Sequence, residues 1–126
     1  MARSTDLVLA TPLALMPAGQ KSADTNGTGV DVLLLEGKAI AILDITNVSG
    51  TTPTADVKLQ ESDTQGGTYT DIAGAAFTQV TTGASLQKIA VEIDPAKRWA
   101  RAALDVGGTS PVYGVAVTLI GQKKTP

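Results

Sequence analysis

The chain has 126 residues, of which ten are basic and twelve acidic; the net charge of −2 gives no strong field for nucleic acid or an anionic membrane. It has no His and no Cys, which excludes disulfides, thiol chemistry and thiolate or imidazole metal ligands, and removes the usual near-neutral base. A hydrophobic fraction of 43% predicts one folded domain with a real core rather than a disordered chain.

The first 29 residues are expected to form an extended N-terminal arm, followed by a β-domain over residues 30 to 126. Leucines alternate with other residues on either side of Pro12, which favours an edge or added strand over a helix. These residues are Leu7, Leu9, Leu13 and Leu15. The alternative is that this segment is simply the first strand of the domain.

The apolar run from Leu7 to Met16 does not predict a secretory signal. Asp6 lies at its edge, Pro12 interrupts it, and no clear small-residue cleavage site follows. No segment of the chain is long enough to span a membrane.

The segment from Asp24 to Asp31 is rich in turn-forming residues and side-chain oxygens, which are the ligands that calcium prefers. It lacks the full spacing and the bidentate Glu of a calcium loop. We therefore assign no metal and no other cofactor to the chain.

From Val30 onward, short segments with alternating hydrophobicity predict eight strands. They are Val30 to Leu35, Ala39 to Asn47, Ala55 to Glu61, Thr68 to Ile72, Ala76 to Thr81, Leu86 to Ile93, Trp99 to Val106 and Val112 to Ile120. The expected turns are Glu36-Gly37, Ser49 to Pro53, Gln65-Gly66-Gly67, Thr82-Gly83, Asp94-Pro95 and Gly107 to Pro111. Such even spacing predicts an all-β fold, an antiparallel β-sandwich of jelly-roll-like type.

Side-chain direction follows from the alternation along each strand. The residues expected in the core are Val57, Leu59, Ile89, Val91, Ile93, Ala100, Ala102, Leu104, Val106, Tyr113, Val115, Val117 and Leu119. The exception is Ala39 to Leu43, which is apolar on both faces. Ile40 and Ile42 therefore lie at a subunit interface or, alternatively, beneath the N-terminal arm.

The only Trp, Trp99, has outward parity and lies beside Arg98 and Arg101, a composition enriched in protein interfaces. The alternative is a Trp that covers the edge of the sandwich with the two Arg stacked on it. Tyr69 is expected to pack across its hairpin, and Phe77 to lie in the core.

Two carboxylates near the hairpin, Glu61 with Asp63 or Asp71, could imitate the acid–base pair of a glycoside hydrolase. Solvated charges around a hairpin are the stronger interpretation, because nothing else in the chain builds a sugar subsite. We therefore expect a protein that is not an enzyme.

Several segments resemble small capsid decoration, or cement, proteins and head-accessory proteins of tailed bacteriophages. The resemblance rests on a strand, a Gly-rich hairpin with its return strand, an Arg-aromatic strand and a Gly-Gly-Thr-Ser-Pro segment. Here these are Val57 to Asp63, Gly66-Gly67, Tyr69 to Ile72, Arg98 to Ala102, and Gly107 to Pro111. They lie within about two thirds of the chain, from Lys38 to Lys123, and do not cover the first 37 residues.

The resemblance implies a structural virion protein on the outer capsid surface, made in the host cytoplasm. Its partners would be the major capsid protein and further copies of itself, as a trimer or else a dimer, without nucleic acid or membrane. Candidate interface residues are Leu7, Leu9, Leu13, Leu15, Ile40, Ile42, Arg98, Trp99 and Arg101. The alternatives are a carbohydrate-binding or host-adhesion module, or a structural protein of the neck or tail.

Overall fold

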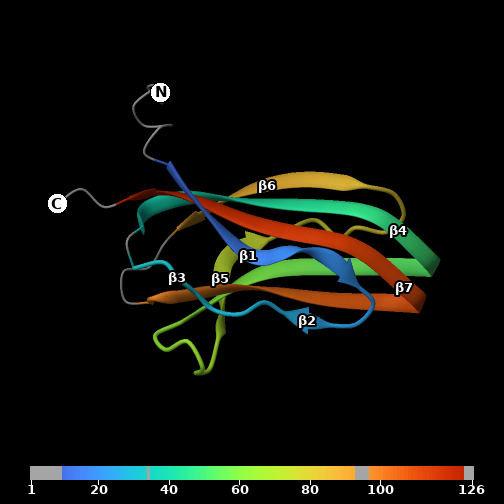
Figure 1. Ribbon diagram of the computed structural model, residues 1–126, viewed down its shortest axis with the longest axis horizontal. Helices are drawn as coiled ribbons and strands as arrows, with labels where there is room; N and C mark the ends of the chain where they lie inside the picture. Colours follow the sequence, from blue (N-terminus) through green and yellow to red (C-terminus); the bar gives the residue numbers. More distant parts are fainter. Residues whose placement is uncertain (1–9, 34, 93–96, 124–126) are drawn as a thin grey trace.

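A computed structural model describes residues 10–33, 35–92 and 97–123 of the chain. The predicted all-β, antiparallel, sandwich-like fold is confirmed (Figure 1). Its strands are β1 Ala10–Lys21, β2 Thr25–Asn26, β3 Val30–Asp31, β4 Leu35–Ser62, β5 Thr70–Ala76, β6 Ser85–Glu92 and β7 Trp99–Lys123. Among these residues no helix is long and apolar enough to cross a membrane.

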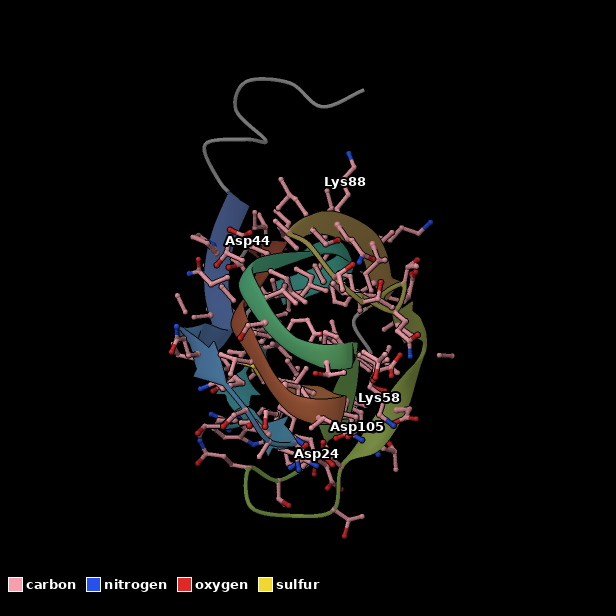
Figure 2. The ribbon with its side chains drawn as sticks, turned by 90° about the vertical axis from the view of Figure 1, so that its right-hand side faces the viewer. Asp24, Asp44, Lys58, Lys88 and Asp105 are labelled. Carbon is pink, nitrogen blue, oxygen red and sulfur yellow. The ribbon has the colours of Figure 1, made fainter. Side chains whose placement is uncertain are left out.

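The two layers of the sandwich are halves of one continuous sheet, because β4 and β7 pass through both. The first layer joins β1, β6, residues 35–46 of β4 and residues 112–123 of β7. The second joins β2, β3, β5, residues 54–62 of β4 and residues 99–107 of β7. Both long strands bend at the right-hand end of Figure 1, and Figure 2 shows these bends facing the viewer.

The bends are built from bulges rather than hairpin turns. The β4–β7 register shifts three times between Thr46 and Thr54, which increases local twist and bends the strands. Gly50 and Gly108 have positive φ angles of 115° and 98°, a region that residues with a Cβ rarely adopt. Each also lies against the other strand: a Cβ on Gly108 would be 2.5 Å from the Thr52 oxygen. The two glycines therefore let the strands approach closely at the corner.

The expected turns at Ser49 to Pro53 and Gly107 to Pro111 are therefore wrong. The turn expected at Glu36-Gly37 is also wrong, because both residues lie within β4, where its register with β7 shifts. Residues 35–62 form one strand where two were predicted, and the same holds for residues 99–123. Of the predicted strand Ala76 to Thr81, Ala76 ends β5 and Val80 makes only an isolated bridge with Ala55. Of Val30 to Leu35, the first two residues form the short β3, and Leu35 begins β4. The expected turn at Asp94-Pro95 lies outside the described residues.

The core lies between the layers, and the predicted alternation is confirmed along both long strands. Leu43 and Ile45 from the first layer pack in one cluster with Leu59 and Leu104 from the second. Val57, Ala100, Ala102, Tyr113, Val115, Val117, Leu119 and Phe77 are also buried, while Ile89 and Val106 are partly buried against the cluster and Ile93 is outside the described residues. The inward-facing side chains of both layers thus make one hydrophobic core.

Residues 10–21 of the expected arm form β1, which pairs along the outer edge of β7 from Ala10↔Gln122 to Lys21↔Tyr113. Leu15 and Met16 point into the core and are fully buried or nearly so. In this structure Ala10–Lys21 thus takes the alternative place, as a strand of the domain's own sheet.

Candidate interaction surfaces

The strand-end surface consists of Asp31, Leu33, Arg98 and Trp99, where β3 meets the start of β7 at the left-hand end of Figure 1. Arg98 donates two hydrogen bonds to one Asp31 oxygen, at 3.1 Å from Nε and 2.8 Å from Nη2. Its guanidinium also lies 5.3 Å from the centre of the Trp99 ring. A cation–π contact and an ion pair therefore favour this position of the Arg98 side chain.

The carboxylate of Asp31 is stabilised in its charged form. The hydrogen bond from Arg98, with a second from the backbone N–H of Leu33 at 2.9 Å, lowers the pKa of Asp31. The same hydrogen bond, which the Asp31 carboxylate accepts, raises the pKa of Arg98. Leu33 remains 43% exposed, so the strand-end surface presents an aliphatic side chain beside an ordered Arg–Trp pair.

The hairpin predicted around Gly66-Gly67 is present between β4 and β5, with the register Gln60↔Asp71 and Glu61↔Thr70. A chain of polar contacts locks it: Arg101 donates to Gln60 at 2.9 Å, Gln60 donates to Asp71 at 2.9 Å, and Lys58 donates to Asp71 at 3.1 Å. The hydrogen bonds from Gln60 and Lys58 lower the pKa of Asp71.

Tyr69 packs within the hairpin, as expected. Its hydroxyl donates to the Gln65 carbonyl at 2.7 Å, and the Arg101 guanidinium lies 4.2 Å from its ring centre. The two Arg predicted beside Trp99 contact different rings: Arg98 lies over Trp99, whereas Arg101 lies over Tyr69. Asp71, one of the carboxylates considered above as a possible pair, thus accepts hydrogen bonds from Gln60 and Lys58.

The β4–β6 face is the outer side of the first layer, where four pairs of residues lie opposite each other. They are Lys38↔Glu92, Ile40↔Ala90, Ile42↔Lys88 and Asp44↔Leu86. Leu86 is 75% exposed and Ile40 45% exposed, while Ile42 is half-buried. The face thus combines aliphatic side chains with charges of both signs.

The nine predicted interface residues fall in different places. Arg98 and Trp99 meet at the strand-end surface in the second layer, whereas Ile40 and Ile42 lie on the β4–β6 face of the first. No part of β1 covers Ile40, so the described residues do not place it beneath the arm. Of the four leucines, Leu13 is half-buried against the core and Leu15 has no exposed surface, which makes Leu15 a core residue; Leu7 and Leu9 are outside the described residues.

Sequence reasoning overlooked Leu86, the most exposed large hydrophobic residue among those described. The signal was present: Leu86 has the parity opposite to that of Ile89 and Val91 on β6, which were assigned to the core. Outward parity on β4 and β6 also identifies Asp44 and Lys88, which lie opposite Leu86 and Ile42 and were not among the candidate interface residues.

The loop from Asp24 to Asp31 is tied to the sheet by both of its carboxylates. Asp24 accepts a hydrogen bond from the Val106 backbone N–H at 2.8 Å, and Asp31 is paired with Arg98. Within the described ranges, no three Asp or Glu side chains gather as a metal site. The two carboxylates of the loop therefore bind a backbone N–H group and the Arg98 guanidinium of this chain.

No protein-family model matches the sequence, and no curated protein matches it.

Proposed function

We propose that the chain is a structural virion protein, a decoration or cement protein that binds the outer capsid surface of a tailed bacteriophage. It would stabilise contacts between major capsid subunits and would do no catalysis. Two independent lines support the proposal: the strand, hairpin and Gly-Gly-Thr-Ser-Pro segments resemble such proteins, and the sandwich displays a preformed contact surface.

The observation that carries the proposal is the strand-end surface. Arg and Trp are the residue types most enriched where protein–protein contacts are strongest, and Arg98 is already ordered over Trp99 by its ion pair with Asp31. A side chain ordered before binding loses less conformational entropy in the complex. Leu33 beside it supplies aliphatic area. The surface is therefore suited to a protein partner such as the major capsid protein.

The test is co-sedimentation of the purified chain with empty heads built from the major capsid protein of the same genome. We expect saturation at a stoichiometry comparable with that of the shell subunit, and heads that withstand a higher temperature or chelation. Cryo-electron microscopy of the decorated heads would distinguish an outer-surface position from a neck or tail position.

Variants at the strand-end surface make this test specific. Leu33→Ser and Arg98→Ala should each weaken binding to heads, because one removes aliphatic contact and the other releases the Trp99 ring. Asp105→Asn is the matched control, since Asp105 is exposed on β7 away from this surface. Equal binding by all four proteins, or no binding by any, would contradict the proposal.

A carbohydrate-binding or adhesion module is the second candidate, favoured by one observation. A small depression beside Trp99 is lined by the apolar residues Val32, Ile72 and Ala100 and by the charged residues Glu61, Glu92 and Lys97. Small-molecule sites combine apolar and aromatic walls with a few polar groups in this way. A glycan array with the isolated protein tests this candidate. Saturable binding that Trp99→Ala abolishes would favour adhesion over the capsid role.

A further inference from the structure

The outer side of the first layer carries a compact square of four side chains. Asp44 lies opposite Leu86, and Ile42 lies opposite Lys88, on adjacent antiparallel strands. Residues directly opposite each other share one face of a sheet, about 5 Å apart, with diagonal neighbours about 7–8 Å apart. The apolar pair, Ile42 and Leu86, thus occupies one diagonal, and the charged pair, Asp44 and Lys88, occupies the other.

Within the described residues, the apolar side chain of Leu86 is left uncovered and the two charged side chains of the square are unpaired. Leu86 is 75% exposed and lies on the β6 strand with Lys88. Asp44 and Lys88 are exposed, and neither makes an ion pair or hydrogen bond with another described residue. Figure 2 shows both on the upper side of the molecule. By contrast, the next charges along the ladder, Lys38 and Glu92, lie directly opposite each other within the chain.

We propose that the β4–β6 face binds a second copy of this chain about a two-fold axis that runs along the Ile42–Leu86 diagonal. Rotation about that axis places Leu86 on the partner's Leu86 and Ile42 on the partner's Ile42. It also places each Lys88 on the partner's Asp44, because the charged diagonal crosses the axis. One square therefore generates an apolar centre with two flanking ion pairs.

Charge is what selects this occupant. A two-fold interface must be self-complementary, so each charge near the axis needs an opposite charge at the position that the rotation places against it. Asp44 and Lys88 meet that condition with each other and need no other protein. The axis runs obliquely to the strands, so the strands of the two copies cross steeply, as in orthogonal sheet packing. The inference favours the dimer over the trimer, and it does not depend on the capsid role.

The test uses charge reversal on the full-length chain, with sedimentation velocity over a series of protein concentrations. The wild type is expected to be a dimer. Asp44→Lys and Lys88→Glu each place like charges across the axis twice, so each should weaken dimerisation by about a hundredfold or more. Asp105→Lys makes the same change of charge on the second layer and should leave the dimer intact. Circular dichroism checks that each variant is folded.

Mixing the two variants separates this geometry from a general loss of association. Asp44→Lys carries two positive charges on the diagonal and Lys88→Glu carries two negative charges, so an equimolar mixture should form a heterodimer although neither variant dimerises alone. The double variant Asp44→Lys/Lys88→Glu should recover the affinity of the wild type to within about tenfold.

Three outcomes would overturn the proposal. They are a wild type that stays monomeric, a trimer, or a dimer that tolerates both single reversals and the mixture equally. If the wild type is monomeric and the same reversals abolish binding to heads, the face contacts the shell and not a second copy. A wild type that dimerises but does not bind heads would count against the capsid role alone.

Discussion

Tyr113 is the largest fully buried side chain, and its hydroxyl joins the first layer to the segment before β6. It donates to the Thr81 carbonyl at 2.8 Å and lies 3.3 Å from the Val80 carbonyl. Tyr113→Phe keeps the ring and removes this donor, so we expect the free energy of unfolding to fall by about 1–2 kcal/mol at neutral pH. Urea denaturation of both proteins measures the difference.

The difference in stability between the wild type and Tyr113→Phe is also expected to depend on pH in the alkaline range. Burial, with a smaller contribution from Asp56, raises the pKa of Tyr113 above its usual 10.0. The unfolded chain then loses its proton at a lower pH than the folded chain, so the wild type loses stability as the pH rises from about 10 through the folded pKa. Tyr113→Phe lacks this loss, and the gap between the two proteins should narrow there. A constant gap would contradict the assignment.

Asp71 predicts the opposite dependence, at acid pH. Hydrogen bonds from Gln60 and Lys58 lower its folded pKa below 3.8, so its stabilising contribution is present above 3.8 and is lost as the pH falls through the folded pKa. Asp71→Asn should therefore be less stable than the wild type at pH 7 and equal to it at the acid limit. The effect is expected to be small, because the pair is exposed and screened by solvent.

Asp63→Asn serves as the control for this prediction, because Asp63 lies on the same hairpin and has no side-chain partner among the described residues. Asp63→Asn removes one carboxylate of this hairpin and none of the contacts of Asp71, so it separates the loss of those contacts from the loss of a charge. Thermal unfolding of the three proteins between pH 7 and pH 3 makes the comparison.

At the scale of elements, the packing of β1 makes residues 10–21 part of the domain, and this can be tested. Leu15 is fully buried in the common core, so Leu15→Ala should lower the free energy of unfolding of the isolated protein by about 2–5 kcal/mol. A segment detached in solution would show almost no effect. Ala14→Ser, at an exposed neighbouring position, is the matched control.

The corner between the layers makes a second prediction. Gly108 has φ of 98°, and a Cβ there would lie 2.5 Å from the Thr52 oxygen and 2.9 Å from the Pro53 Cα, both backbone atoms that cannot move aside easily. Gly108→Ala should therefore destabilise the fold by about 1–3 kcal/mol. Gly66→Ala is the control, because a Cβ at Gly66 meets nothing within 4 Å. Equal stability of both variants in denaturant would refute the role assigned to the corner.

The elements also show what the sequence could predict. Alternation gave the correct facing of Val57, Leu59 and Tyr113, because one face of each strand is buried and the period of two is strict. It could not show that Ser49 to Pro53 is a corner. Gly, Thr and Pro mark both a reversal and a bulge, and only the pairing of both β4 halves with β7 distinguishes them.

The candidate surfaces follow the same division. Outward parity identified Ile40, Ile42 and Trp99 and, applied to Leu86, would have completed the β4–β6 face. Parity could not show that Arg98 pairs with Asp31, 67 positions away, while Arg101 turns to the hairpin. Such contacts depend on which strands become neighbours, which a single sequence does not specify.

At the scale of the whole molecule, the shared strands predict strong cooperativity. Each layer contains one half of β4 and one half of β7, and the side chains of both layers pack in one core. Opening one layer exposes the inner face of the other, so we expect a single two-state unfolding transition. In native-state hydrogen exchange, the amides of residues 35–46 and 54–62 should open with the same free energy.

Leu119→Ala and Leu59→Ala, one in each layer and both about equally buried, sharpen this expectation. If the layers unfold together, each substitution should reduce protection in both halves of β4 by the same amount, because both report on one global opening. If Leu119→Ala reduced protection in residues 35–46 alone, the layers would be separate folding units. Since the bend at Thr46 to Thr54 is continuous strand in the present structure, the common response is the expected one.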